Sequence, residues 1–156
     1  FKVYHPLAFY AVTFTVRGED FDAESAMMGK AAVRHRMDIL IEKGNERTAK
    51  EESQLTTYQV VYEMMARGLG FLPVDLYKSD ATRFQLEDGK IRLPFTSLKG
   101  LGETAAYSLF TAAKKEAFIS CDDIITRASV SKTVIETMRA AGALGDLPES
   151  SQTTLF

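Results

Sequence analysis

The sequence predicts a mainly helical α+β protein, in which short helices accompany one small β element. Apolar side chains recur every three or four positions over most of the 156 residues, as on one face of a helix. Apolar and polar residues alternate only between about residues 71 and 93, around the turn-forming pair Asp88-Gly89. The composition, 46% hydrophobic and 26% charged, is that of an ordinary globular protein.

The first predicted helix lies in YHPLAFYAVTF, where Pro6 suits the first turn. Its apolar surface would run almost all round, through Leu7, Phe9, Tyr10 and Phe14. We therefore expect it to be buried. Because the chain opens on Phe1 inside an apolar-patterned segment, we also expect a fragment of a longer chain. Part of residues 1–20 would then be mobile or packed against a neighbouring copy.

Two further helices precede the β element. The first is predicted over residues 23–43, capped by Asp22 and ended by Gly44. Its apolar stripe would consist of Met27, Met28, Ala31, Val33, Met37, Leu40 and Ile41. The second, over residues 56–67, would bury Val60, Val61, Met64 and Met65 and end at Gly68.

The alternating segment predicts a strand at 71–76 and a hairpin of residues 83–87 with 90–93. After Pro94 the sequence is helical again, in short pieces within residues 98–118, 120–128 and 131–145. Pro148 ends the predicted structure, and a loose tail follows.

The most informative stretch is SLKGLGETAAYSL, in which Gly100 and Gly102 flank Leu101 just before a helix. This spacing allows a tight turn, and the helix adds unpaired N–H groups and the positive end of its dipole. Such a site suits one phosphate, as in helix-hairpin-helix motifs that hold a DNA backbone without reading bases. The candidate phosphate-binding residues are Lys99, Gly100, Leu101, Gly102, Glu103 and Thr104. A glycine-punctuated helix–turn–helix without a ligand is the alternative.

A second candidate turn lies in RASVSKTVIETMRAAGAL, with Ser129, Val130 and Ser131 in place of Gly-Leu-Gly. Ser131 would cap the following helix, and Lys132 and Thr133 would add donors to a phosphate. The candidate residues here are Val130, Ser131, Lys132 and Thr133. Without glycines, the turn is equally well explained as a structural partner that packs against the first one.

The charge limits any nucleic-acid function. The whole chain has a formal charge of −2, and residues 93–149 carry six basic and seven acidic side chains. Because this small number of basic side chains can neutralise only a few phosphates, we expect weak duplex binding whose affinity depends little on salt. The module would be an accessory grip on DNA.

No catalytic, metal or cofactor site is expected in this chain. Asp20 and Asp22 are better explained as helix caps, and His5 and His35 have no partners at ligand or triad spacing. The single cysteine, Cys121, excludes a disulfide framework and favours a reducing cytoplasm. No apolar run approaches the ~18 residues of a membrane span, so no membrane partner is expected.

Three elements, YHPLAFYAVTFTVRGEDFD, LPFTSLKGLGETAAYSL and SKTVIETMRAAGALGDLPESSQTTLF, occur in one order. In this combination the whole chain resembles the C-terminal region of the PolC-type alpha subunits of bacterial DNA polymerase III, a family of replicative polymerases. The resemblance implies distal fingers at residues 1–92, a tandem helix-hairpin-helix domain that holds primer–template duplex at 93–149, and a sliding-clamp-binding tail at 150–156. It also implies that the active site and Mg²⁺ of this cytoplasmic DNA-directed DNA polymerase (a nucleotidyltransferase) lie upstream.

The last residues fit the clamp-binding pattern Q-x-x-L-F of that family. The candidates are Gln152, Thr153, Thr154, Leu155 and Phe156, with Thr153 where an apolar residue is common. Burial of Leu155 and Phe156 would contribute ~1.5–3 kcal/mol each, and ordering five residues would cost ~1–2 kcal/mol each. An isolated tail should therefore bind weakly, and tethering would turn that contact into processivity.

Two other functions remain open. One is a protein-interaction module whose helix-hairpin-helix elements only pack and whose tail alone has a partner. Replacement of the Gly100–Gly102 turn would weaken duplex binding by a polymerase fragment and leave it unchanged in such an interaction module. The other is a hairpin domain of a repair nuclease, which is less favoured because such a chain would bring a metal-binding domain and a more basic face.

Overall fold

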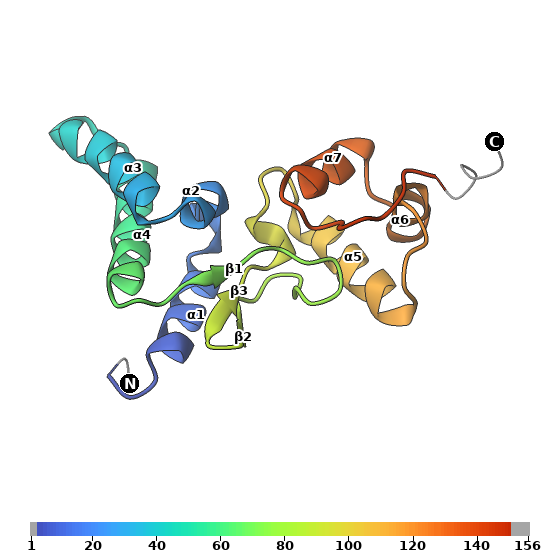
Figure 1. The fold of residues 1–156 in the computed structure, drawn as a ribbon. Helices are drawn as coiled ribbons and strands as arrows, with labels where there is room; N and C mark the ends of the chain where they lie inside the picture. The colour runs from blue at the N-terminus through green and yellow to red at the C-terminus, as the bar shows by residue number, and fades with distance from the viewer. Residues whose placement is uncertain (1–2, 151–156) are drawn as a thin grey trace. The chain divides into compact units, whose positions relative to one another are not determined.

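The structure, a computed structural model, describes residues 3–150 (Figure 1). Seven α-helices, three one-turn 3-10 helices and three short strands lie in this range, which confirms the mainly helical α+β class. The chain forms two compact units, one of Phe1–Leu72 with Arg83–Arg92 and the other of Pro73–Thr82 with Leu93–Phe156. The segment Pro73–Thr82 thus belongs to the second unit, although it precedes the position where the sequence placed the boundary.

Aromatic rings form the core of the first unit. Helix α1, Pro6–Val16, buries Tyr10, Ala11 and Phe14. The ring of Phe14 lies 5.2–5.7 Å, between centroids, from those of Phe21, Phe71 and Phe84. The expectation that this part of the chain would be mobile or packed on another copy is therefore wrong for the described residues, because α1 packs within its own unit.

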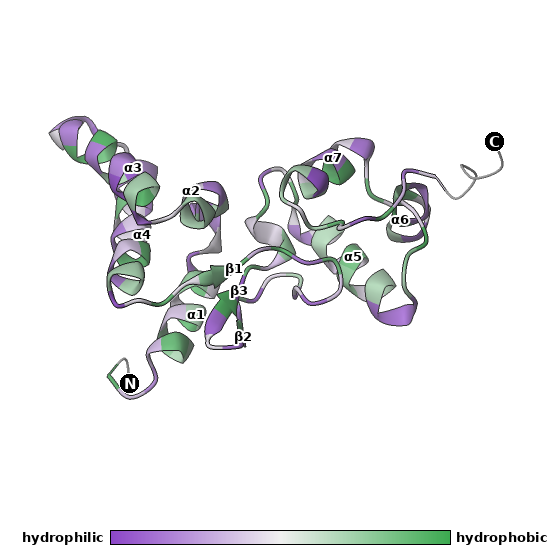
Figure 2. Cartoon of the chain, viewed as in Figure 1, coloured by the Kyte–Doolittle hydropathy of each residue, from purple (hydrophilic) through white to green (hydrophobic). Residues whose placement is uncertain are grey.

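Helix α1 is nevertheless not buried on all sides. The side chains of Val12 and Val16 are 60% and 81% exposed, and the helix is apolar along most of its length in Figure 2. The aromatic core takes up only the face that carries Tyr10 and Phe14. The all-round burial expected from its composition is thus only half correct.

Glycine divides the long helix that the sequence predicts over residues 23–43. Helix α2 covers Ala23–Met28 and α3 covers Lys30–Glu42, and Gly29 between them has φ +114° and ψ −179°. This backbone favours glycine and turns the chain, so Val33, Met37 and Leu40 are buried while Met27 and Met28 stay exposed. One-turn helices follow each of two elements: η1, Gly18–Asp20, after α1 and η2, Gly44–Glu46, after α3.

Helix α4, Ala49–Ala66, begins seven residues earlier than predicted. Its start is fixed by a capping box, in which Glu51 N donates to Thr48 Oγ1 and Thr48 N donates to Glu51 Oε1, both at 3.1 Å. The contact between α3 and α4 is the most extensive between any two elements described.

The β element is a three-stranded sheet in the order β1-β3-β2. Strand β3, Lys90–Arg92, pairs in parallel with β1, Phe71–Leu72, and antiparallel with β2, Gln85–Glu87. Asp88 and Gly89 have φ +51° and +76°, as both central residues of a type I′ turn require, so the predicted hairpin is confirmed. The strand predicted at 71–76 stops after Leu72, because Pro73 lacks an N–H and the chain there enters the second unit.

The second unit consists of η3, Phe95–Ser97, and helices α5, Glu103–Lys115, α6, Cys121–Ala128, and α7, Lys132–Ala140. The segment Pro73–Thr82 is tied to it by backbone hydrogen bonds, from Leu76 N to Ala143 O and from Phe95 N to Asp80 O. Buried apolar side chains from each part fill the core, among them Val74, Leu76, Leu93, Phe95, Leu109, Phe118, Ile124 and Met138.

Candidate nucleic-acid interface

The first hairpin connects η3 to α5. Leu101 N donates to Leu98 O at 3.2 Å, which closes a four-residue turn. Gly100, the third residue of this turn, has φ +84°, the conformation that a type II turn requires there and that favours glycine. The helix expected before the hairpin is only the single turn η3.

Leu101 fastens this turn to the core. Its side chain is 4% exposed, whereas Lys99, Gly100, Gly102, Glu103 and Thr104 around it are all exposed. The candidate residues of the first hairpin therefore lie together at the surface. The exception is the Leu101 side chain, which is buried in the core and holds the turn in place.

The start of α5 carries free donors. Gly102 is the N-cap, and no side chain caps the helix. Within the described part of the chain, the backbone N–H groups of Glu103, Thr104 and Ala105 have no hydrogen-bond partner, because the first bond of the helix is donated by Ala106 N to Gly102 O. These groups and the helix dipole form the anion-binding geometry expected from the sequence.

The second hairpin, between α6 and α7, resembles the first at three successive backbone positions. Ser129 has φ +54°, as Gly100 has a positive φ, and Val130 is 6% exposed. Ser131 is the N-cap with φ −82° and ψ 163°, close to the −77° and 174° of Gly102. The repeat that the sequence suggests is therefore present in the backbone.

The two hairpins differ in how their helices are capped. Ser131 Oγ accepts a hydrogen bond from Val134 N at 3.3 Å, which satisfies one donor of the first turn of α7. Ser131, Lys132 and Thr133 are exposed. The second hairpin thus offers fewer free backbone donors than the first, beside the ammonium of Lys132 and the hydroxyl of Thr133.

Arg127 joins α6 to the end of α5. Its guanidinium donates to the carbonyl oxygens of Ala112, Glu116 and Ala117 and to Asp123, at 2.9–3.2 Å. It also lies over the ring of Phe118, 4.4 Å from the centroid. The carbonyls at the end of a helix lack partners of their own, so Arg127 caps α5 and fixes the position of the second hairpin beside it.

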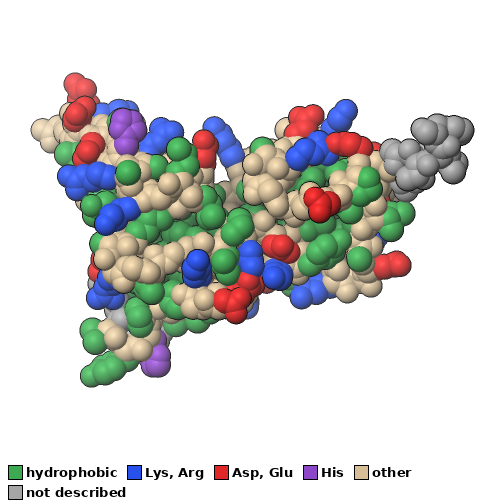
Figure 3. All heavy atoms as spheres, in the orientation of Figure 1, with side chains coloured by type: hydrophobic (Ala, Val, Ile, Leu, Met, Phe, Trp, Pro, Cys, Tyr) green, Lys and Arg blue, Asp and Glu red, His purple; other side chains and the backbone are tan. Residues whose placement is uncertain are grey.

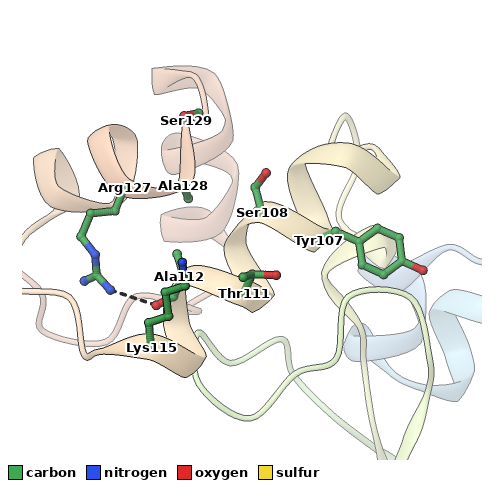
Figure 4. Close-up of a pocket in the computed structure, with 8 residues that line it drawn as sticks. All are labelled: Tyr107, Ser108, Thr111, Ala112, Lys115, Arg127, Ala128 and Ser129. Carbon is green, nitrogen blue, oxygen red and sulfur yellow. Dashed lines mark hydrogen bonds between the residues drawn. The ribbon is translucent and has the colours of Figure 1, made fainter.

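A pocket of about 500 Å³ lies beside that hairpin (Figure 4). It is lined from α5 by Ser108, Thr111 and Lys115 and from the other side by Arg127 and Ser129. These α5 residues were not among those predicted. Their spacing of three and four places them on one helix face, but only the packing of α6 turns that face into a pocket.

Other candidate groups have structural roles. Asp22 caps α2, since its Oδ1 accepts from Ser25 N at 3.1 Å, and Asp20 accepts from Ser53 Oγ. The thiol of Cys121 is buried and accepts from Arg139. Residues 3–150 contain no cluster of three or more metal-ligating side chains, and none of their helices is long and apolar enough to cross a membrane.

Basic and acidic side chains are mixed on one face of the molecule (Figure 3). Figure 3 shows lysines and arginines interspersed with aspartates and glutamates on the face in view. The predicted clamp-binding residues Gln152–Phe156 lie outside the described residues.

Comparison with known proteins agrees with this geometry. The family described as "Helix-hairpin-helix motif" matches residues 68–154. This chain is also similar to proteins named DNA polymerase III PolC-type. Over 156 residues it is 46% identical to the one from Clostridium perfringens, 44% to the one from Bacillus cereus and 41% to the one from Thermotoga maritima. The alignment covers the whole of this chain but 11% of each of these relatives.

The resemblance to PolC-type polymerases therefore extends over the full chain, which corresponds to only about a ninth of their length. The matched family spans more than half of the chain and both hairpins. The chain belongs to the helix-hairpin-helix motif family.

Proposed function

We propose that this chain is the part of a replicative DNA polymerase that holds the primer–template duplex and tethers the enzyme to the sliding clamp. The relatives named DNA polymerase III PolC-type and the helix-hairpin-helix match support the polymerase assignment. In this proposal nucleotidyl transfer, with its Mg²⁺, is carried out by other parts of the polymerase, and residues 1–92 belong to its distal fingers. This chain contributes the grip, in the bacterial cytoplasm.

The observation that carries the proposal is the glycine at the N-cap of α5, Gly102. Gly100 is explained by its backbone, since its φ is +84°. Gly102 has φ −77°, which any residue adopts, and an added Cβ would meet no atom within 4 Å. Serine stands at the equivalent position of the second hairpin and caps its helix. Glycine at this N-cap leaves the free N–H groups of α5 open to the close approach of a ligand, whereas a serine hydroxyl would occupy one of them.

A phosphate suits this site better than a carboxylate side chain of a partner protein does. Two turns in one unit, each with a positive φ before the N-cap of a helix and each beside an exposed lysine, Lys99 or Lys132, suit two phosphates of one duplex. Contacts from backbone N–H groups read no bases, so the grip would be independent of DNA sequence. The nearly neutral charge of the unit implies a weak grip whose affinity depends little on salt.

Gly102→Ser tests this proposal. The new hydroxyl would cap α5 and occupy the donors offered to phosphate, so we expect duplex affinity to fall about tenfold, the equivalent of one lost charge-assisted hydrogen bond. Stability should stay equal or rise by a few tenths of a kcal/mol. The measurement is fluorescence anisotropy with a labelled primer–template duplex at low salt. Gly18→Ser is the control, because Gly18 also has open space around it and lies in the first unit.

The result that contradicts the grip is equal duplex binding by Gly102→Ser and the unchanged chain, with both folded. It would favour the alternative, a protein-interaction module in which the hairpins only pack. Absence of duplex binding by the unchanged chain at high concentration would contradict the grip as well.

The tether is tested separately, with purified bacterial sliding clamp. We expect the full chain to bind the clamp weakly and a chain that ends at Ser151 to lose this binding. Leu155→Ala with Phe156→Ala should reproduce the loss, because the two apolar side chains supply the buried area. Thr153→Leu should strengthen binding. Equal binding by the full and shortened chains would refute the tail as the clamp contact.

A further inference from the structure

The pocket beside the second hairpin has the chemistry of an anion site. Four hydroxyl-bearing side chains line it, those of Tyr107, Ser108, Thr111 and Ser129, together with the cations of Lys115 and Arg127. No aspartate or glutamate is among its lining residues, although the surface of the unit carries slightly more acidic than basic residues. Hydroxyl and ammonium groups donate hydrogen bonds to phosphate oxygens, and a carboxylate in their midst would repel them.

The walls of the pocket are held in place. Arg127 forms one wall, and its guanidinium is bound by three carbonyls and a carboxylate. Figure 4 shows Arg127 and Ser129 across from the α5 residues, with the bond from Arg127 to Ala112 O closing the side of the pocket. The charge of Arg127 is therefore used within the fold, which leaves Lys115 as the cation that the pocket offers to a ligand.

Lys115 has a neighbour that serves as a comparison. Lys114 also lies in the last turn of α5, where either ammonium interacts favourably with the helix dipole. The ammonium of Lys114, however, lies 5.2 Å from the centroid of the Phe110 ring and does not line the pocket. The two lysines share charge, helix and exposure, and only Lys115 faces the hydroxyl groups.

We infer that this pocket binds a phosphate group, and that its ligand is a backbone phosphate of the duplex next to the one held at the second hairpin. Ser129 belongs to both the hairpin turn and the pocket wall, so a strand that reaches the hairpin passes the mouth of the pocket. Lys115 supplies the charge, and Ser108 and Thr111 supply hydrogen bonds. This inference rests on the proposed function, since it assigns further contacts to the same grip.

The test compares Lys115→Ala with Lys114→Ala in the 156-residue chain. The measurement is duplex affinity against salt concentration. Loss of one neutralised phosphate changes the slope of log K against log salt by about 0.9, so Lys115→Ala should flatten the slope by that amount and weaken binding about tenfold at low salt. Lys114→Ala should leave the slope unchanged, and Lys115→Arg should restore it. Thr111→Val should weaken binding about threefold without changing the slope.

The outcomes separate this inference from the proposed grip. In one outcome the unchanged chain binds duplex, Gly102→Ser weakens that binding, and Lys115→Ala and Lys114→Ala behave alike. The proposed grip then stands, and the pocket contact is refuted. If the unchanged chain binds no duplex, both fail. Inorganic phosphate distinguishes the source of the ligand. Saturable NMR shifts of Ser108 and Lys115 with phosphate alone, together with unchanged duplex binding by Lys115→Ala, would assign the pocket to a free phosphate compound and overturn the inference.

Discussion

Gly100 and Ser129 occupy equivalent positions in the two hairpins, and both have a positive φ, +84° and +54°. Each precedes a buried apolar residue and the N-cap of a helix. Glycine adopts this conformation freely, whereas for another residue it costs about 1–2 kcal/mol. The second hairpin therefore keeps the turn geometry at a cost in stability that the first hairpin avoids.

Ser129→Gly should remove that cost. We expect the free energy of unfolding to rise by about 0.5–1 kcal/mol, because relief of the backbone strain exceeds the added flexibility of the unfolded chain. Urea denaturation followed by circular dichroism measures it. Ser131→Gly is the matched control: the same substitution two residues on, at φ −82°, should cost a few tenths of a kcal/mol through loss of the cap. Destabilisation by Ser129→Gly would show that its side chain contributes more than its backbone loses.

The glycines of the first hairpin should respond differently to alanine. Gly100→Ala forces a side chain into a positive φ, so it should lower the free energy of unfolding by about 1–2 kcal/mol. Gly102→Ala meets no neighbouring atom and an ordinary φ, so it should cost less, about 0.5 kcal/mol, because alanine is a poorer N-cap than glycine. Thermal denaturation of the two variants is the measurement. Equal losses at both positions would mean that Gly102 has a structural role that its surroundings do not reveal.

Local signals in the sequence were sufficient to predict where the turns lie. Asp88-Gly89 and the two hairpins are specified by residues within a few positions of one another, and the structure places them as expected. Gly29 shows the limit of this reasoning. A lone glycine inside a helical pattern is compatible with a continuous helix, and only the packing of α3 against α4 explains why the chain turns there.

Features that depend on distant parts of the chain could not be predicted. Ser79 Oγ donates to Leu93 O at 2.7 Å, which helps to hold the segment Pro73–Thr82 in the second unit, yet nothing in its sequence specifies that partner. Likewise Ser108, Thr111 and Lys115 form a helix face in sequence, but the pocket exists because Arg127 holds α6 against α5.

Arg127 should be a major contributor to the stability of the second unit. Its planar guanidinium reaches three carbonyls, one carboxylate and the Phe118 ring at once, and a lysine ammonium cannot reproduce this fork. We expect Arg127→Lys to lower the free energy of unfolding by about 2 kcal/mol. Arg34→Lys is the control, because its pair with Asp38 is exposed and should change stability by less than about 0.5 kcal/mol. Similar stabilities of the two variants in urea denaturation would contradict the assigned role.

A hydrogen bond between two helices should make the first unit sensitive to acid. Tyr58 Oη in α4 donates to Asp22 Oδ2 at 2.7 Å. Burial acts to raise the pKa of Asp22, but the hydrogen bonds from Tyr58 and Ser25 and the charge of Arg36 outweigh it, so the pKa lies below its ordinary value. In the folded state the carboxyl is then the stronger acid. Its contribution to stability is complete above the pKa of the unfolded chain, near 4, and is lost as the pH falls through the lower pKa of the folded state.

The chain should therefore be more stable than Asp22→Asn at pH 7, by about 1–2 kcal/mol, and this advantage should shrink below about pH 4. Urea denaturation at a series of pH values measures the difference. Tyr58→Phe removes one of the bonds to the carboxylate, so it should raise the pKa of Asp22, which an NMR titration of the carboxyl carbon reports directly. The same mutation should leave the backbone cap from Asp22 to Ser25 N in place. A difference between the unchanged chain and Asp22→Asn that is independent of pH would show that Asp22 acts only as a neutral cap, and that its charge does not stabilise the contact between α2 and α4.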